Sequence, residues 1–131
     1  MKKRLWISPV LGVAVLLAAC GGSSGVGETE AEEPTYSPET IAEGKTIFQQ
    51  TCFACHGPEG KGLPNLGKDL TTSAFVNSST DVELLAFVLK GRAVDDALNT
   101  TGVAMPPKGG FSFLTENDIN SIIAFIRSIQ E

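Results

Sequence analysis

The sequence predicts a small all-α domain, and three observations along the 131-residue chain support this prediction. Three segments carry helical patterns that start at capping residues. No segment alternates apolar and polar residues as a half-buried strand does. Long segments rich in Gly, Pro, Asn and Thr, residues 57–79 and 91–114, separate the helices. Loops of this length are unusual in so small a domain unless another component organises them.

The first predicted helix lies in "SPETIAEGKTIFQQ", residues 37–50. Ser37 can cap the helix, and Pro38 occupies the first helical position, where a missing N–H costs nothing. The residues at helical spacing on one face are Ile41, Gly44, Ile47 and Phe48. We therefore expect this face to pack against the rest of the domain.

Two further helices begin with the spacing of a capping box. In "TDVELLAFVLKG", Thr80 stands three residues before Glu83, and Gly91 provides a stop signal. In "TENDINSIIAFIRSIQ", Thr115 stands three residues before Asp118. The apolar residues of this last helix also recur at helical spacing, at Ile119, Ile122, Ile123, Ile126 and Ile129.

The N-terminus has the pattern of an export signal over residues 1–19. A basic "MKKR" precedes an apolar run of 15 residues, which is shorter than the roughly 20 residues of a membrane-spanning helix. The run ends in "LAAC", which resembles the lipobox of bacterial lipoproteins. This resemblance implies that Cys20 is lipidated and becomes the first residue of the mature protein. An ordinary cleaved signal with a free Cys20 and an uncleaved anchor helix are the alternatives.

Residues 20–36 form a segment of Gly, Ser and Glu that predicts a flexible acidic tether. Residues 37–131 then form the one folded domain. The chain is acidic, with a net charge of −5, which does not indicate a nucleic-acid partner.

The most informative segment is "TCFACHG", where Cys52 and Cys55 are three residues apart and His56 follows at once. A structural zinc site needs four ligands, so a carboxylate would have to complete this set. A dithiol oxidoreductase would carry its cysteines after a strand of a βαβ unit, and no such pattern is visible. Covalent haem attachment uses all three side chains: the thiols add to the two vinyl groups, and the imidazole binds the iron.

An iron held by one histidine has a sixth coordination position, and Met105 is the candidate ligand for it. This is the one methionine outside the predicted signal, and it lies in "GVAMPPKGG", a loop bounded by Gly and Pro. Methionine also fills gaps in apolar cores. A core methionine usually lies on a helix face, however, so the loop position favours an iron ligand.

Together these segments resemble class I cytochromes c over about residues 38–131. The matching pieces are the first helix, "CFACH", "LPNLG", "AMPP" and "IIAFIRSI". The resemblance implies a small all-α fold with three main helices and long loops wrapped around one covalently bound haem c. It further implies that Gly44 lies where the first and last helices cross, and that Phe48 packs near Ile122 and Phe125.

The resemblance also implies roles for residues around the haem. The carbonyl of Pro64 would accept a hydrogen bond from His56, and Leu66 would press on the haem. The aromatic residues that bind the haem propionates in mitochondrial members are missing, and we expect Arg92, Thr71 and Thr72 to replace them. A surface position for Arg92, beyond the helix stop, is the alternative. Lys61, Lys68 and Lys108 lie in the segments expected to flank the haem, where they would steer a redox partner; the alternative is that they are only solvated loop residues.

The function that these inferences favour is electron transfer and not enzymatic catalysis. We expect a membrane-tethered monohaem cytochrome, outside the cytoplasm, that passes single electrons between redox partners of a respiratory or photosynthetic chain. It loosely resembles the monohaem lipoprotein subunits of respiratory complexes such as alternative complex III. A peroxidase-like haem enzyme and a haem-based gas sensor with a displaceable Met105 are the alternatives.

Overall fold

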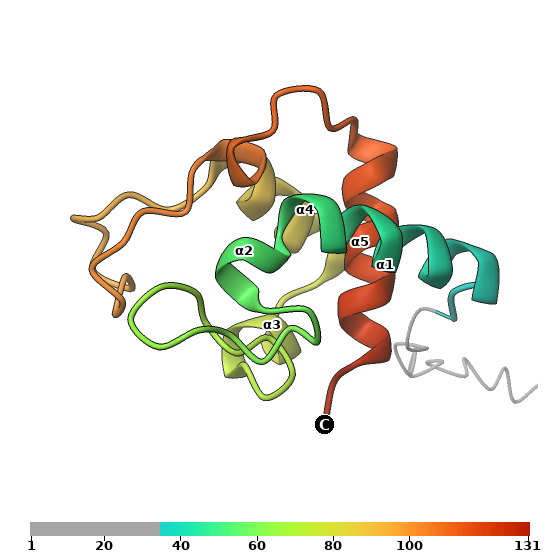
Figure 1. The fold of residues 1–131 in the computed structure, drawn as a ribbon, viewed down its shortest axis with the longest axis horizontal. Coiled ribbons are helices and arrows are strands. Elements are labelled where there is room, and N and C mark those ends of the chain that lie inside the picture. Colours follow the sequence, from blue (N-terminus) through green and yellow to red (C-terminus); the bar gives the residue numbers. More distant parts are fainter. Residues whose placement is uncertain (1–34) are drawn as a thin grey trace, which may run out of the picture. The chain divides into compact units, whose positions relative to one another are not determined.

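A computed structural model describes residues 35–131 of the chain. The predicted signal peptide, Cys20 and most of the predicted tether lie outside the described residues. The helices are α1 (Pro38–Thr51), α2 (Phe53–His56), α3 (Ala74–Ser78), α4 (Asp81–Lys90), the 3-10 helix η1 (Pro107–Gly110) and α5 (Glu116–Ser128). These described residues contain no strand, and the three longest helices are the three predicted ones, so the all-α prediction is confirmed (Figure 1).

The three predicted helix starts form as the sequence indicates. The side chain of Ser37 accepts a hydrogen bond from the Thr40 amide, with Pro38 in the first turn of α1. Capping boxes begin α4, between Thr80 and Glu83, and α5, between Thr115 and Asp118. Helix starts are predictable from sequence here because a cap depends on residues only three positions apart.

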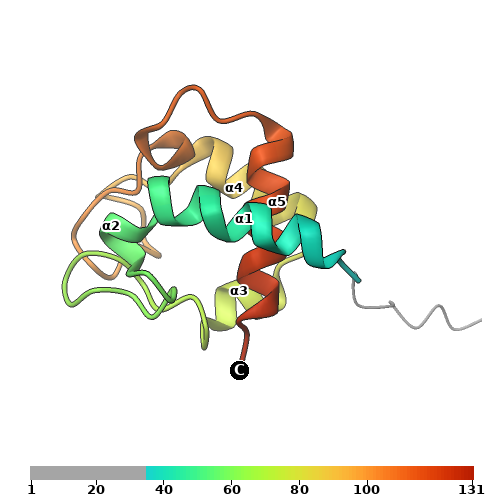
Figure 2. The same cartoon turned by 45° about the vertical axis from the view of Figure 1, so that its right-hand side comes forward.

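Helices α1 and α5 cross closely, and the core of the domain gathers at their contact (Figure 2). A Cβ atom on Gly44 would lie 1.7 Å from the backbone oxygen of Ser121, so only glycine permits this crossing. The rings of Phe48 and Phe125 stack in a tilted pair with centroids 5.2 Å apart, and Phe48 is fully buried. The predicted position of Gly44 and the packing of Phe48 are therefore confirmed.

The Gly44→Ala variant is expected to lower the free energy of unfolding by about 3 kcal/mol, near the upper end of overpacking effects. The new methyl group meets backbone atoms, which cannot rotate away as a side chain can. Chemical denaturation of the haem-loaded protein measures the effect. Thr46→Ala, an exposed position on the same helix, should change stability by less than about 0.5 kcal/mol. Equal stabilities of the two variants would contradict the close crossing.

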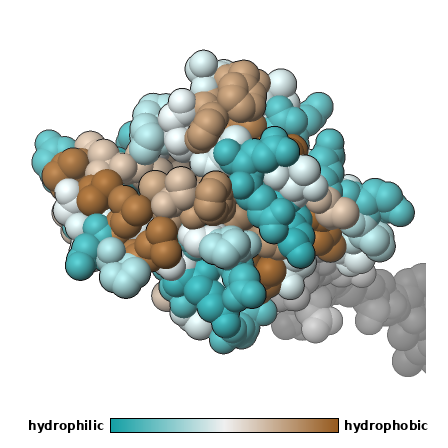
Figure 3. Space-filling view, viewed as in Figure 1, coloured by the Kyte–Doolittle hydropathy of each residue, from teal (hydrophilic) through white to brown (hydrophobic). Residues whose placement is uncertain are grey.

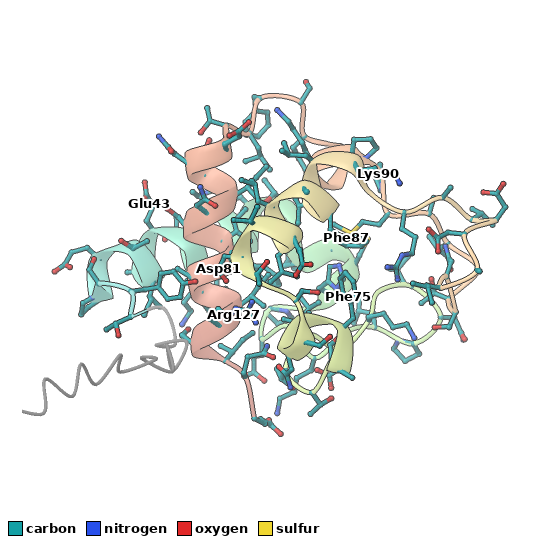
Figure 4. All side chains as sticks on the ribbon, turned by 180° about the vertical axis from the view of Figure 1, so that it is seen from behind. Glu43, Phe75, Asp81, Phe87, Lys90 and Arg127 are labelled. Carbon is teal, nitrogen blue, oxygen red and sulfur yellow. The ribbon has the colours of Figure 1, made fainter. Side chains whose placement is uncertain are left out.

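Tyr36, which precedes the N-cap of α1, contacts the domain through its side chain. The Tyr36 hydroxyl donates to the carboxylate of Asp81, which also accepts from Arg127 Nε at 3.0 Å (Figure 4). Burial and the neighbouring carboxylate raise the pKa of Tyr36 to about 12. Arg127 further donates to the carbonyl oxygens of Val76 and Ser79. This network joins the start of α1 to α3, α4 and α5.

Among residues 35–131, none of the helices combines the length and apolar character needed to cross a membrane.

Candidate functional site

Cys52 and Cys55 lie on one helical turn at the junction of α1 and α2. Cys52 caps α1, its amide donating to the Phe48 carbonyl at 2.8 Å. The amides of Cys55 and His56 both donate to the Cys52 carbonyl, at 3.2 and 3.0 Å. Neither cysteine is in a disulfide. The turn thus brings the two thiols and the imidazole predicted from "CFACH" into one short segment.

Of the two thiols, Cys52 is partly buried and Cys55 is exposed. Burial raises the pKa of the Cys52 thiol, although a hydrogen bond with Thr51 acts in the opposite direction. Cys52 therefore remains a neutral thiol at physiological pH. A neutral thiol has the S–H proton that addition across a vinyl group consumes.

His56 is held by one hydrogen bond from its ring. Its Nδ1 donates to the Lys68 carbonyl at 2.8 Å. Burial lowers the pKa of His56 because it disfavours the charged imidazolium, and the bond to Lys68 partly opposes that shift. A neutral ring protonated on Nδ1 leaves the lone pair of Nε2 available for a metal.

The predicted hydrogen bond from His56 to Pro64 is wrong in this structure, because the acceptor is Lys68. The reason lies in the turn between Leu63 and Gly67, which pair across it. Gly67 lies against α2, and a Cβ there would be 2.2 Å from the Cys55 carbonyl oxygen. The next carbonyl along the chain therefore faces the imidazole, while Pro64 is exposed in the turn. Leu66 lies in the same turn and is partly buried.

Met105 lies in a loop that is fixed through its backbone. Its amide and carbonyl exchange hydrogen bonds with those of Arg92, at 2.9 and 2.8 Å. A Cβ on Gly91 would lie 2.2 Å from the Met105 carbonyl oxygen, so glycine allows the loop to approach the end of α4. The Met105 side chain is partly buried and belongs to no helix face. Because backbone groups hold the loop, the Met105 thioether is not needed to fix the loop's position.

Arg92 carries a partly buried positive charge, and one of its donors has no hydrogen-bond partner. Its guanidinium lies over the rings of Phe75 and Phe87, 5.1 and 4.8 Å from their centroids, and donates to the Leu98 carbonyl. Phe75 on α3 and Phe87 on α4 also contact each other (Figure 4). The Nε atom is buried without a hydrogen-bond partner, since the Asp96 carboxylate is 3.9 Å away. A buried donor without a partner is unfavourable and indicates a site for an additional acceptor.

The other predicted propionate partners are less available. The amide and hydroxyl of Thr71 both donate to the Asp69 carboxylate at 2.7 Å, and Thr71 is buried. Thr72 is exposed. Of the residues predicted for this task, Arg92 therefore fits best.

Apolar surface gathers around these residues. In Figures 1 and 2, α2 lies at the same end of the domain as the loop that joins α4 to η1. Figure 3 shows hydrophobic side chains on that end. The large apolar residues exposed in α2, α3 and the loops between helices include Phe53, Leu63, Phe75, Val94, Leu98 and Val103. Surface of this kind indicates a binding site for an apolar group.

The donor set fits a covalently attached haem. Two free thiols lie one turn apart, a neutral imidazole follows them, and a thioether lies in a loop at the same end of the fold. The unpaired Nε of Arg92 matches the need of a carboxylate for a buried donor. The exposed apolar side chains match a large planar hydrophobic group.

The three lysines predicted to flank the site differ in their surroundings. Lys61 and Lys68 are exposed, in agreement with a role in docking. Lys108 is partly buried, and its ammonium donates to the Leu114 carbonyl at 2.7 Å. The ammonium of Lys108 is thus engaged within the chain, whereas a role in docking stays a prediction for Lys61 and Lys68.

Some residues of the site were not predicted from the sequence. Gly91 was interpreted only as a helix stop, and its role in admitting the Met105 backbone depends on a tertiary contact. The two rings beneath Arg92 come from different helices, and the first belongs to α3, which is only five residues long. A serine at its N-cap, Ser73, was the available sequence signal.

Comparisons with known proteins agree with this arrangement. The family described as "Cytochrome C oxidase, cbb3-type, subunit III" matches residues 39–126. The cytochrome c-551 of Bacillus subtilis is 38% identical over 69 residues, which are 50% of this chain and 61% of that protein. The cbb3-type cytochrome c oxidase subunit CcoP of Azospirillum brasilense is 27% identical over 96 residues, 70% of this chain and 31% of that subunit.

Two further similarities concern an oxidase subunit and a solved structure. The cbb3-type cytochrome c oxidase subunit FixP of a Bradyrhizobium species is 36% identical over 61 residues, 46% of this chain and 21% of that subunit. The crystal structure of cytochrome CL from Methylophaga aminisulfidivorans superposes with a TM-score of 0.54 at 24% identity, over 72% of this chain and 55% of that one. This likeness supports the fold. The chain spans less than two thirds of the length of each of these relatives.

Proposed function

The chain belongs to the cytochrome c family described as cytochrome C oxidase, cbb3-type, subunit III, and we propose that it is a membrane-tethered monohaem electron carrier. Members of this family bind one covalent haem c, and a cytochrome c domain implies haem-based electron transfer. The further steps of the proposal are the residues that hold the haem, the membrane anchor and the place in an electron-transfer chain.

The observation that carries the proposal is the single turn that presents Cys52, Cys55 and His56 together. The Cys52 and Cys55 thiols would hold the haem through thioether bonds, each S–H adding across one vinyl group. His56, through Nε2, and Met105, through its thioether, would be the protein's ligands to the haem iron. When bound, the haem iron supplies one-electron chemistry by alternating between its ferric and ferrous states.

The chain's other residues bind and orient the group. The Lys68 carbonyl fixes the ring of His56 and keeps its proton on Nδ1. Arg92 would use its unpaired Nε for a haem propionate, in a guanidinium already oriented by two aromatic rings. Leu66 would contact the haem from the turn between α2 and α3. The apolar side chains at this end would exclude water and so reduce the reorganisation that accompanies each electron transfer.

The proposed partners are other redox proteins or a membrane-bound respiratory complex. The relatives FixP and CcoP are named as subunits of cbb3-type oxidases, and their likeness to this chain supports such an assembly. Exposed Lys61 and Lys68 would favour an acidic partner surface. We place the protein outside the cytoplasm, on the membrane that its lipid would enter.

Spectroscopy of the full chain, produced with a cytochrome c maturation system, tests the proposal. Haem should remain on the protein through acid-acetone extraction, and the ferric form should show the near-infrared charge-transfer band of Met–iron ligation. A haem enzyme with an open iron position would lack that band. Absence of covalent haem would overturn the proposal.

The Cys20→Ala variant is expected to lose membrane association or to accumulate with its signal uncleaved. A diacyl group buries many methylene groups in the bilayer at about 0.8 kcal/mol each, so its removal should release the protein. Membrane fractionation with detection of haem measures the change, and the unaltered chain is the reference. Recovery of the unaltered protein as a soluble species that begins after Cys20 would contradict lipid anchoring.

A further inference from the structure

The segment that follows Met105 has an unusual backbone. Lys108 adopts a left-handed conformation, with φ 54° and ψ 29°. This region is unfavourable for residues that carry a Cβ atom and is common only for glycine. The next two residues, Gly109 and Gly110, also have positive φ, and both are glycines. A lysine side chain at position 108 is thus present where glycine would be favoured, which indicates that the side chain has a task.

The side chain of Lys108 reaches back to the core. Its ammonium donates to the carbonyl of Leu114 at 2.7 Å, in a partly buried setting. Leu114 is itself buried and stands directly before Thr115, the N-cap of α5. A hydrogen bond from a charged donor is stronger than one between neutral groups. The bond therefore connects η1 to the residue that precedes the N-cap of α5.

The other end of the segment is tied to α4. Met105 exchanges two backbone hydrogen bonds with Arg92, and Gly91 admits the chain close to the helix end. The Gly109 amide donates to the Pro106 carbonyl at 2.9 Å, and the two prolines stiffen the chain between these points. Residues 105–108 are consequently held on the α4 side by the backbone. On the α5 side, the Lys108 ammonium bonds the Leu114 carbonyl, beside a local turn in which the Phe111 amide donates to the Lys108 carbonyl at 3.1 Å.

We propose that Lys108 is a positioning residue for Met105. By closing the loop onto Leu114, its ammonium restricts the movement by which the Met105 thioether would leave the iron. The inference rests on the proposed ligation by Met105 and adds the element that keeps this ligand in place. The lysine is thus internal to the ligand loop and is not part of a docking surface.

Imidazole binding to the ferric protein tests the proposal, because imidazole must displace the sixth ligand. In Lys108→Asn, which tolerates the left-handed backbone but lacks the charge, the apparent affinity for imidazole is expected to rise about tenfold, equivalent to about 1.4 kcal/mol. The rise follows from a larger fraction of molecules with the loop open. Lys45→Asn, at an exposed lysine of α1, should leave the affinity unchanged.

The Lys108→Gly variant separates the side chain from the backbone. If only backbone strain mattered, glycine would relieve it, and imidazole would bind no more tightly than to the unaltered protein. We expect imidazole to bind Lys108→Gly more tightly than the unaltered protein, as it should bind Lys108→Asn. Lys108→Arg should keep the imidazole affinity of the unaltered protein, because arginine provides a cationic donor. Imidazole affinities in the Asn and Gly variants equal to that of the unaltered protein would overturn the proposal while leaving Met105 as ligand. An unaltered protein without the near-infrared band would overturn the ligation itself.

Discussion

Replacing both Cys52 and Cys55 with serine is expected to abolish covalent haem attachment completely. A serine hydroxyl is a far weaker nucleophile than a thiol and does not form the corresponding bond to a vinyl group. The turn should still form, because its hydrogen bonds join the backbone of Cys52 to that of Cys55 and His56. The measurement is the haem that remains with the polypeptide after denaturation and acid-acetone extraction.

The third cysteine of the chain provides the matched control. Cys20→Ser removes the same chemical group elsewhere and should leave all haem attached, although the protein should lose membrane association or keep its signal uncleaved. Each single variant, Cys52→Ser or Cys55→Ser, should keep one thioether and one free vinyl group, with a shifted visible spectrum. Haem that stays on the double variant through extraction would show that another side chain holds it.

Features of the fold that depend on neighbouring residues could be predicted from the sequence. The three caps at Ser37, Thr80 and Thr115 formed as expected, because each needs only a side chain and an amide three residues away. The crossing at Gly44 followed from the family resemblance and is confirmed by the close approach of Ser121. The order CFACH likewise specifies one helical turn, since helical geometry relates positions three and four apart.

Features that depend on how loops fold back could not be predicted in detail. The acceptor for His56 is Lys68 and not Pro64, because the positive φ of Asn65 and the approach of Gly67 to α2 set the course of that turn. The network of Tyr36, Asp81 and Arg127 joins residues more than forty positions apart, which no local pattern indicates. Because the contact of Tyr36 with Asp81 is not visible in the local sequence, Tyr36 was predicted to belong to the tether.

The candidate site shows the same division. Cys52, Cys55, His56 and Met105 were recognisable because few residues of these types occur in the chain. The surroundings of Arg92 could not be recognised in the sequence, because its guanidinium is positioned by aromatic rings from two different helices, α3 and α4. The engagement of Lys108 with Leu114 was equally invisible, because the lysine lies in a loop whose conformation departs from the common backbone regions.

The Met105→Ala variant is expected to lose the near-infrared charge-transfer band and to lower the reduction potential. Axial ligands shift haem potentials over a range of roughly 0.8 V, so loss of the thioether should lower this potential by on the order of 0.1 V. A thioether favours ferrous iron relative to the water that would replace it. Potentiometric titration of the haem-loaded protein measures the shift. Thr100→Ala, at an exposed position in the same loop, should retain both band and potential.

The decisive comparison is Met105→Leu, because leucine nearly conserves the volume of methionine but offers no lone pair to a metal. The loop should persist in this variant, since Met105 is bonded to Arg92 through backbone groups that the substitution leaves in place. If Met105 only filled space, the unaltered protein would lack the band, Met105→Leu would keep the potential and the stability, and Met105→Ala would lose stability alone. If the thioether binds iron, the two variants should lose the band and potential alike. The ferric forms of both should then bind small ligands such as cyanide much faster than the unaltered protein, because no side chain has to leave the iron first.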